Sequence, residues 1–207
     1  MKRDTAEKLW TLRPGNVGYI KLTFSLTKDS IHNFFKAIND TKAIIVDLRQ
    51  YPNPNTFHEF LSYTFKDSIP FAKFLKFDIT NPGYFKFNSD GFIFLKSKKD
   101  LYQGKIIVLV SEYTQSLGEF WTMALQVLPK TTVIGSTTWG ADGDRSSFYL
   151  PGKLECGFSG LGIFYPDGSV CQRKGIRIDI EARPTIEGLR AGKDELLDRA
   201  IRFANEQ

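Results

Sequence analysis

The chain has 207 residues, of which 42% are hydrophobic and 25% charged, and its formal net charge at pH 7 is +5. This length suits one large domain or two small ones, and no apolar run approaches the roughly 18 residues needed to span a membrane. The positive charges are scattered, and their densest cluster, at 96–99, is followed by Asp100, which favours a solvated turn over a nucleic-acid-binding surface.

The first half of the chain shows strand and helix patterns separated by turn residues. In order, they are a strand at 16–24, an amphipathic helix at 27–38 capped by Thr27 or Asp29, a buried strand at 43–48, a turn-rich loop at 49–55, a helix at 57–63, and an aromatic region at 70–100 that indicates short strands or an extended excursion.

The second half continues the alternation. It has a buried strand at 106–110, a helix at 117–128, a strand at 131–135, a Gly-, Ser- and Asp-rich loop at 136–152, a β-meander at 154–172, a short strand at 178–180 and a helix at 193–204. We find no internal repeat and no long linker. The pattern predicts one α/β domain at 15–207, preceded by an N-terminal extension at 1–14.

Ser116 stands where a strand-to-helix loop becomes a helix, because the apolar positions from Leu117 onward recur at helical spacing. Free N–H groups and the positive end of the helix dipole surround this position. A serine there can attack a carbonyl while backbone N–H groups receive the oxyanion. Ser116 and Glu119 also match a capping box, so a purely structural role is the alternative.

The two cysteines and two histidines limit metal and redox chemistry. The spacing of Cys156 and Cys171 matches no zinc pattern, and His32 and His58 are isolated in the sequence. We therefore expect no metal site. A disulfide across a hairpin and two buried free thiols both fit the two cysteines, so the redox compartment stays open.

Several motifs follow one another in a set order. They lie at 45–52 (IVDLRQYP), at 110–116 (VSEYTQS) with Glu119 and Phe120 behind it, at 134–143 (IGSTTWGADG), and at 150–152, 158–160, 165–168, 172–176 and 179–180. This ordered set resembles the S41 serine peptidases, the family of C-terminal processing proteases and tricorn-core domains, and is most similar to its Bacteroidetes-type members. The resemblance covers about 15–205.

The resemblance implies a ClpP/crotonase-like α/β core and hydrolysis of peptide bonds by a serine, without metal or cofactor. Ser116 matches the family nucleophile, and the N–H of Leu117 would form part of the oxyanion hole. Parallel strands share the edge where their C-terminal ends meet, so we expect the loops at 49–55 and 138–144 to form the walls of one cleft with Ser116. The residues expected to line that cleft are Arg49, Tyr51, Thr138, Gly140 and Ala141.

The chain departs from the family at three positions that matter for catalysis. Ala141 stands where processing proteases have a lysine general base, and Gln172 stands about where tricorn-like members have a glutamate. Pro54 lies where other members have a glycine that donates an oxyanion N–H, and proline has no N–H to donate. The histidine of tricorn-like members would lie upstream of the matched motifs.

The sequence does not identify a general base in place of the family's lysine. His58 follows the loop at a strand end and is a weak candidate, whereas His32 has the setting of a structural histidine on a helix. Asp142 and Asp144 are flanked by glycine and are typical of turn residues, and Lys153 and Lys174 are typical solvated charges. We therefore expect this chain to be a weak or inactive peptidase.

The alternative is a catalytically inactive S41 relative that binds a peptide or a small apolar ligand. For the peptidase the expected partner is a peptide or protein substrate, with no nucleic acid and no membrane span, and the oligomeric state is open. The amino terminus lacks the apolar core of a signal peptide, although the family resemblance implies an exported or periplasmic protein.

Overall fold

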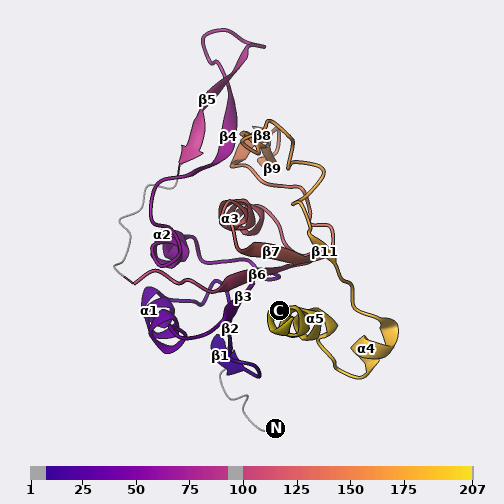
Figure 1. The fold of residues 1–207 in the computed structure, drawn as a ribbon. Coiled ribbons are helices and arrows are strands. Elements are labelled where there is room, and N and C mark those ends of the chain that lie inside the picture. The colour runs from indigo at the N-terminus through magenta and orange to yellow at the C-terminus, as the bar shows by residue number, and fades with distance from the viewer. Residues whose placement is uncertain (1–7, 93–99, 207) are drawn as a thin grey trace.

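The computed structural model describes residues 8–92 and 100–206, and its centre is a six-stranded sheet (Figure 1). The strands are β1 (Trp10–Arg13), β2 (Val17–Lys21), β3 (Ala43–Asp47), β4 (Pro70–Phe77), β5 (Phe85–Phe92), β6 (Lys105–Val110), β7 (Thr131–Gly135), β8 (Arg145–Leu150), β9 (Leu154–Ser159), β10 (Gly162–Phe164) and β11 (Ile180–Glu181). The helices are α1 (Lys28–Ala37), α2 (Phe57–Leu61), α3 (Leu117–Gln126), α4 (Ile186–Arg190) and α5 (Glu195–Asn205), with a 3-10 turn, η1 (Pro54–Thr56), before α2.

The central sheet has the strand order β1-β2-β3-β6-β7-β11, and every neighbouring pair is parallel except β1 and β2. Its inner strands are apolar throughout because both faces are covered. Successive side chains point to opposite faces, so Ile44 and Val46 pack on one side while Ala43 and Ile45 pack on the other.

Helices cover the two faces unequally. On one face α1, α2 and α3 bury a large aromatic core that includes Phe34, Phe60 and Trp121. On the other face α5 contributes four buried side chains, which are Leu196, Leu197, Ala200 and Ala204. Figure 1 shows α5 on the opposite side of the sheet from α1, α2 and α3.

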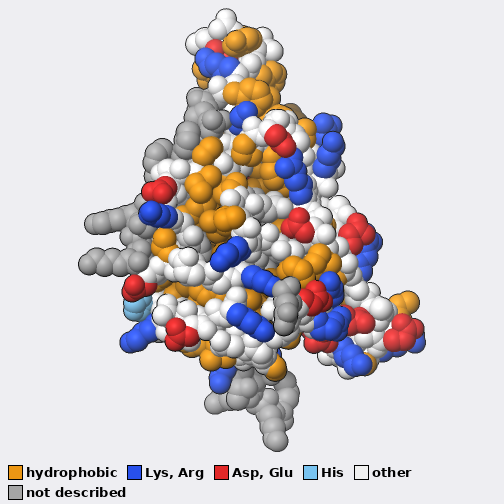
Figure 2. Space-filling model, viewed as in Figure 1, with side chains coloured by type: hydrophobic (Ala, Val, Ile, Leu, Met, Phe, Trp, Pro, Cys, Tyr) orange, Lys and Arg blue, Asp and Glu red, His pale blue; other side chains and the backbone are white. Residues whose placement is uncertain are grey.

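Two small antiparallel sheets stand above α3. The strands β4 and β5 form a long hairpin that projects from the body and is joined by β10, and β8 pairs with β9 in a second hairpin (Figure 1). Hydrophobic side chains are exposed on both hairpins, and Figure 2 shows them gathered on the projecting hairpin and on the surface below it. They include Phe77, Ile79, Tyr84, Phe85, Phe87, Phe148, Tyr149, Leu154 and Phe158.

The predicted α/β class is confirmed, as are the three buried strands at β3, β6 and β7. Thr27 caps α1 as expected, accepting from the N–H of Ser30 at 3.1 Å. The single meander at 154–172 is wrong, because β9 pairs with β8 and β10 pairs with β4. The sheet also begins before residue 15, since β1 pairs with β2.

Three other expectations concern the cysteines, a membrane span and the basic cluster. Cys156 and Cys171 are both free thiols, and Cys171 is buried. No helix within the described ranges has the length and apolar character of a membrane span. The basic cluster at 96–99 lies outside the described residues.

Candidate active site

Ser116 occupies a strained position between β6 and α3. The strand ends at Val110, a short loop follows, and the helix begins at Leu117. Ser116 has φ 48° and ψ −116°, a conformation that L-residues rarely adopt and that costs about 1–3 kcal/mol. A strained strand-to-helix turn is how several hydrolases expose a nucleophilic serine. The placement of Ser116 at this junction is as predicted.

Glu119 holds this turn in place from inside the protein. Its side chain is fully buried, and its Oε2 accepts hydrogen bonds from the N–H of Ser116 at 3.0 Å and from the N–H of Ala141 at 2.9 Å. Its Oε1 accepts from the Thr138 hydroxyl at 2.5 Å and from the N–H of Gly140 at 2.7 Å. One carboxylate therefore ties the turn that carries Ser116 to the loop after β7.

A third segment joins the same network. The Thr138 hydroxyl accepts from the N–H of Ile176 at 3.0 Å, and the N–H of Arg173 donates to the Gly140 carbonyl at 2.6 Å. Gly140 has φ +64°, and a Cβ there would lie 2.7 Å from the backbone nitrogen of Arg173. Only glycine fits this close approach, so the loops at 138–141 and 171–176 pack as one unit behind Ser116.

A cavity of about 580 Å³ opens beside Ser116. Its walls combine apolar side chains with three charged ones, which are Lys76, Asp142 and Asp144. The lining residues are Tyr51, Pro54, Phe74, Lys76, Ser116, Leu117, Phe120, Asp142, Gly143, Asp144, Leu161 and Ile163. Leu117 begins α3, where backbone N–H groups have no partner within the helix.

Asp142 is the buried acidic group of this cavity. It is 4% exposed, and its Oδ1 accepts from the N–H of Gly143 at 2.8 Å. Its Oδ2 is buried and has no hydrogen-bond partner among the described residues. Burial, followed by the charges of Glu119 and Asp144, raises the pKa of Asp142 to about 7, against the backbone hydrogen bond from Gly143, which lowers it.

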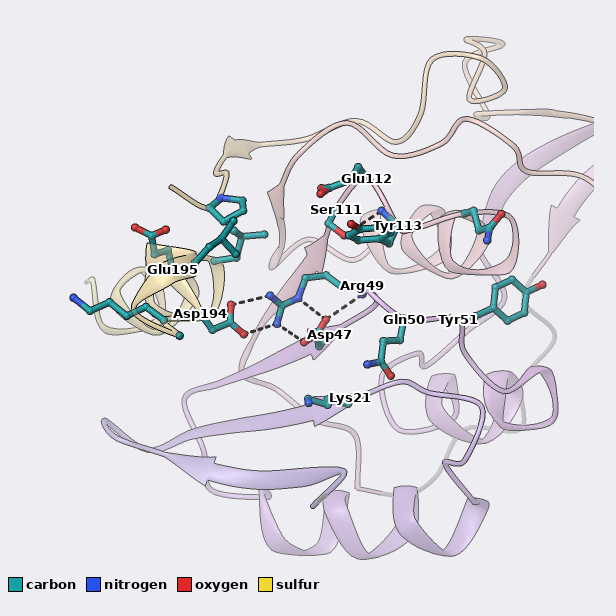
Figure 3. A pocket seen from close by; sticks show the side chains of 16 residues that line it. Lys21, Asp47, Arg49, Gln50, Tyr51, Ser111, Glu112, Tyr113, Asp194 and Glu195 are labelled. Carbon is teal, nitrogen blue, oxygen red and sulfur yellow. Dashed lines mark hydrogen bonds and ion pairs between the residues drawn. The ribbon is translucent and has the colours of Figure 1, made fainter. Parts of the chain in front are cut away.

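A second cavity of about 720 Å³ lies along the same sheet edge, around Arg49 (Figure 3). The Arg49 guanidinium bonds both oxygens of Asp47, at 2.9 and 2.6 Å, and both oxygens of Asp194 at the start of α5, at 2.7 Å each. Burial opposes its charge, but these hydrogen bonds outweigh burial and raise the pKa of Arg49. Tyr51 lines both cavities.

The structure separates the residues predicted to line the cleft. Tyr51 lines the Ser116 cavity, whereas Arg49 lines the second cavity. Thr138, Gly140 and Ala141 do not line either one, because they lie behind the turn and bond Glu119.

Neither histidine is placed to act on Ser116. His58 is exposed on α2, its ring packs edge-on against Phe57, and no hydrogen bond joins it to Ser116 within the described chain. His32 lies on α1 with its Nδ1 2.8 Å from the Tyr63 hydroxyl. We expected His58 to lie away from the nucleophile. A base from this chain must therefore be a different side chain.

Sequence reasoning missed two residues of the site. It gave Glu119 a helix-capping role within the matched motif, and it favoured a turn role for Asp142 over that of a catalytic acid. The signal for Glu119 was a carboxylate within a strongly apolar helix, and for Asp142 it was its place directly after the loop that carries the lysine in related peptidases.

Comparisons with known proteins agree with this geometry. The model of peptidase family S41 matches residues 74–182, which is more than half of the 207-residue chain. No curated protein matches the sequence.

Solved structures share the fold. A peptidase structure from Parabacteroides merdae is 19% identical with a TM-score of 0.83 over 95% of this chain and 64% of its own. Mature CPAF in complex with lactacystin is 15% identical with a TM-score of 0.73 over 89% of this chain and 50% of its own. An S41 protease structure from Bacteroides fragilis is 15% identical with a TM-score of 0.66 over 94% of this chain and 56% of its own. This chain therefore spans between half and two thirds of these relatives, and it belongs to peptidase family S41.

Proposed function

We propose that this chain is a serine-type peptidase domain in which Ser116 is the nucleophile. The observation that carries the proposal is the strained backbone of Ser116 at a strand-to-helix turn, beside a cavity. Backbone strain of this kind persists only where surrounding contacts enforce it, and Glu119 supplies that enforcement through the Ser116 N–H. A serine that served only as a helix cap would not need this conformation.

The surroundings of Ser116 suit attack on a peptide carbonyl. The hydroxyl oxygen would add to the carbonyl carbon, and the N–H of Leu117 would donate to the resulting oxyanion. The positive end of the α3 dipole stabilises the same negative charge. Pro54 lines the cavity without an N–H, so the second oxyanion donor must be another group.

The cavity wall indicates which part of a substrate it would hold. Phe74, Phe120 and Leu161 present apolar surface next to Ser116. We expect an apolar substrate side chain to bind there, with the scissile carbonyl over the start of α3. Burying such a side chain contributes about 1.5–3 kcal/mol, enough to favour apolar over charged residues at that substrate position.

A fluorophosphonate probe tests the nucleophile directly. The purified protein is expected to form a covalent adduct on Ser116, detected by intact mass and peptide mapping, and Ser116→Ala is expected to lose it. Ser30→Ala, which removes a hydroxyl on α1 outside both cavities, should label like the wild type. Labelling that survives Ser116→Ala would show a different nucleophile, and a wild type that never labels would favour the non-catalytic, peptide-binding alternative.

A further inference from the structure

We propose that the Asp142 carboxylate is the general base of this site and takes the proton from the Ser116 hydroxyl. The inference rests on the proposed function, because it assigns a partner to the same nucleophile. It assigns the base to a residue that lines the cavity itself, whereas His32 and His58 do not line it.

The first support is proximity. Asp142 and Ser116 line one cavity. The Glu119 Oε2 accepts from the N–H groups of both Ser116 and Ala141, so these two nitrogen atoms lie no more than about 6 Å apart. Asp142 is the next residue after Ala141. Asp142 therefore follows directly after a residue whose backbone lies close to that of Ser116, and both residues line the same cavity.

The second support is an acceptor without a partner. Buried polar atoms in native proteins are nearly always hydrogen-bonded, and an orphan needs an explanation. Asp142 lines the cavity, and its Oδ2 is buried with no partner among the residues described, while its Oδ1 accepts from the N–H of Gly143. A catalytic base needs an acceptor of this kind, held free until the substrate and the serine hydroxyl come together.

The third support is the rigidity of the Asp142 backbone. The Gln172 amide donates to the Asp142 carbonyl at 2.6 Å and to the Leu161 carbonyl at 2.8 Å, and its oxygen accepts from the N–H of Ile163 at 3.3 Å. Gln172 is thus fully occupied with backbone groups. It is a positioning residue for Asp142 and is not itself a base.

The charged groups around Asp142 affect its pKa. Glu119 faces it from α3, Asp144 from its own loop and the buried Cys171 thiol from the following segment, and Lys76 of β4 lines the same cavity. Burial and the two carboxylates bring its pKa close to neutrality. A general base works best when its pKa lies near the working pH, so Asp142 is better matched than an exposed aspartate.

The proposed step balances as follows. The Ser116 oxygen forms a bond to the carbonyl carbon while its proton moves to Asp142, which becomes the neutral acid. The C–N bond then breaks, and Asp142 returns the proton to the leaving amine. A water molecule attacks the acyl-enzyme, gives its proton to Asp142, and the ester bond to Ser116 breaks as the proton passes back to the serine oxygen.

The test measures the rate at which Ser116 is acylated by the fluorophosphonate probe between pH 5 and 9. The wild-type rate should rise with pH through about 7, because the base must be the carboxylate form. Asp142→Asn has the same shape but no basic group, so its rate should fall by about 10²–10⁴-fold and lose this pH step. Asp40→Asn makes the same charge change in the loop after α1 and should leave the labelling rate and its pH dependence unchanged.

The outcomes separate the two proposals. Ser116-specific labelling that is as fast and as pH-dependent in Asp142→Asn as in the wild type would overturn the role of Asp142 and leave the nucleophile standing. Absence of Ser116-specific labelling in the wild type would overturn both. Asp142→Glu keeps the basic group and should recover part of the rate, which a merely structural role for Asp142 would not produce. Circular dichroism confirms that each variant is folded.

Discussion

Glu119→Ala is expected to lower the free energy of unfolding by about 3–5 kcal/mol, because it leaves several buried donors without an acceptor. The donors are the N–H groups of Ser116, Gly140 and Ala141 and the hydroxyl of Thr138. Glu119 is fully buried, and a water molecule in the vacated space would be a neutral acceptor with fewer lone pairs than the carboxylate. Urea denaturation followed by circular dichroism measures the change.

Glu119→Gln is the matched variant that keeps the shape of the side chain but removes its charge and one acceptor oxygen. In either orientation its NH2 group replaces an oxygen that accepts from two donors. The N–H of Gly140 loses its acceptor in one orientation, and the N–H groups of both Ser116 and Ala141 lose theirs in the other. We expect a smaller loss of stability than with alanine, and slower labelling of Ser116 in both variants under conditions where they remain folded. A Glu119→Gln variant with wild-type stability and labelling would show that the buried carboxylate is not what holds the turn.

Arg49→Ala is expected to cost about 3–5 kcal/mol of unfolding free energy, because it leaves the carboxylate of Asp47 buried without its cation. Asp47 is 5% exposed, and it would keep the hydrogen bonds from the hydroxyl of Tyr19, at 2.8 Å, and from the backbone N–H of residue 49. Arg49→Lys keeps the charge but loses the planar guanidinium that bonds two carboxylates at once. Its free energy of unfolding should therefore lie between those of the wild type and Arg49→Ala.

Asp194→Asn separates the buried from the exposed half of this ion pair. The side chain of Asp194 is 41% exposed, so weakening its contact with Arg49 should cost no more than about 1 kcal/mol. Equal losses for Arg49→Ala and Asp194→Asn would mean that the bridge to α5 matters more than the pairing of Asp47. Thermal and urea unfolding of the three variants measure these differences.

The sequence predicted those parts of the fold whose pattern is local. The strands β3, β6 and β7 are continuous apolar runs, and they lie where those runs lie. The strand β8 was missed because its side chains are mostly exposed, so no apolar alternation marks it. The pairing of β10 with β4 joins segments far apart in the chain, and no local pattern contains that information.

In the candidate site, too, local features could be predicted from the sequence and contacts between distant segments could not. The position of Ser116 follows from a strand pattern and a helix pattern that meet, both of which are local. The three bonds that Glu119 receives from residues 138–141, and the burial of Asp142, arise only when distant loops pack together. An aspartate beside glycine is most often a turn residue, so its burial in the cavity is a property of the tertiary structure.

The arrangement of the two core faces also has a consequence for how the protein is made. The face that carries α1, α2 and α3 takes its last buried residue from Ile176, whereas the opposite face is covered by α5, whose four buried side chains follow later in the chain. Until α5 leaves the ribosome, an apolar sheet surface stays open to solvent and to other chains. The turn that carries Ser116 is therefore translated before the helix that covers the second face of its sheet, and docking of α5 completes the scaffold beneath Ser116.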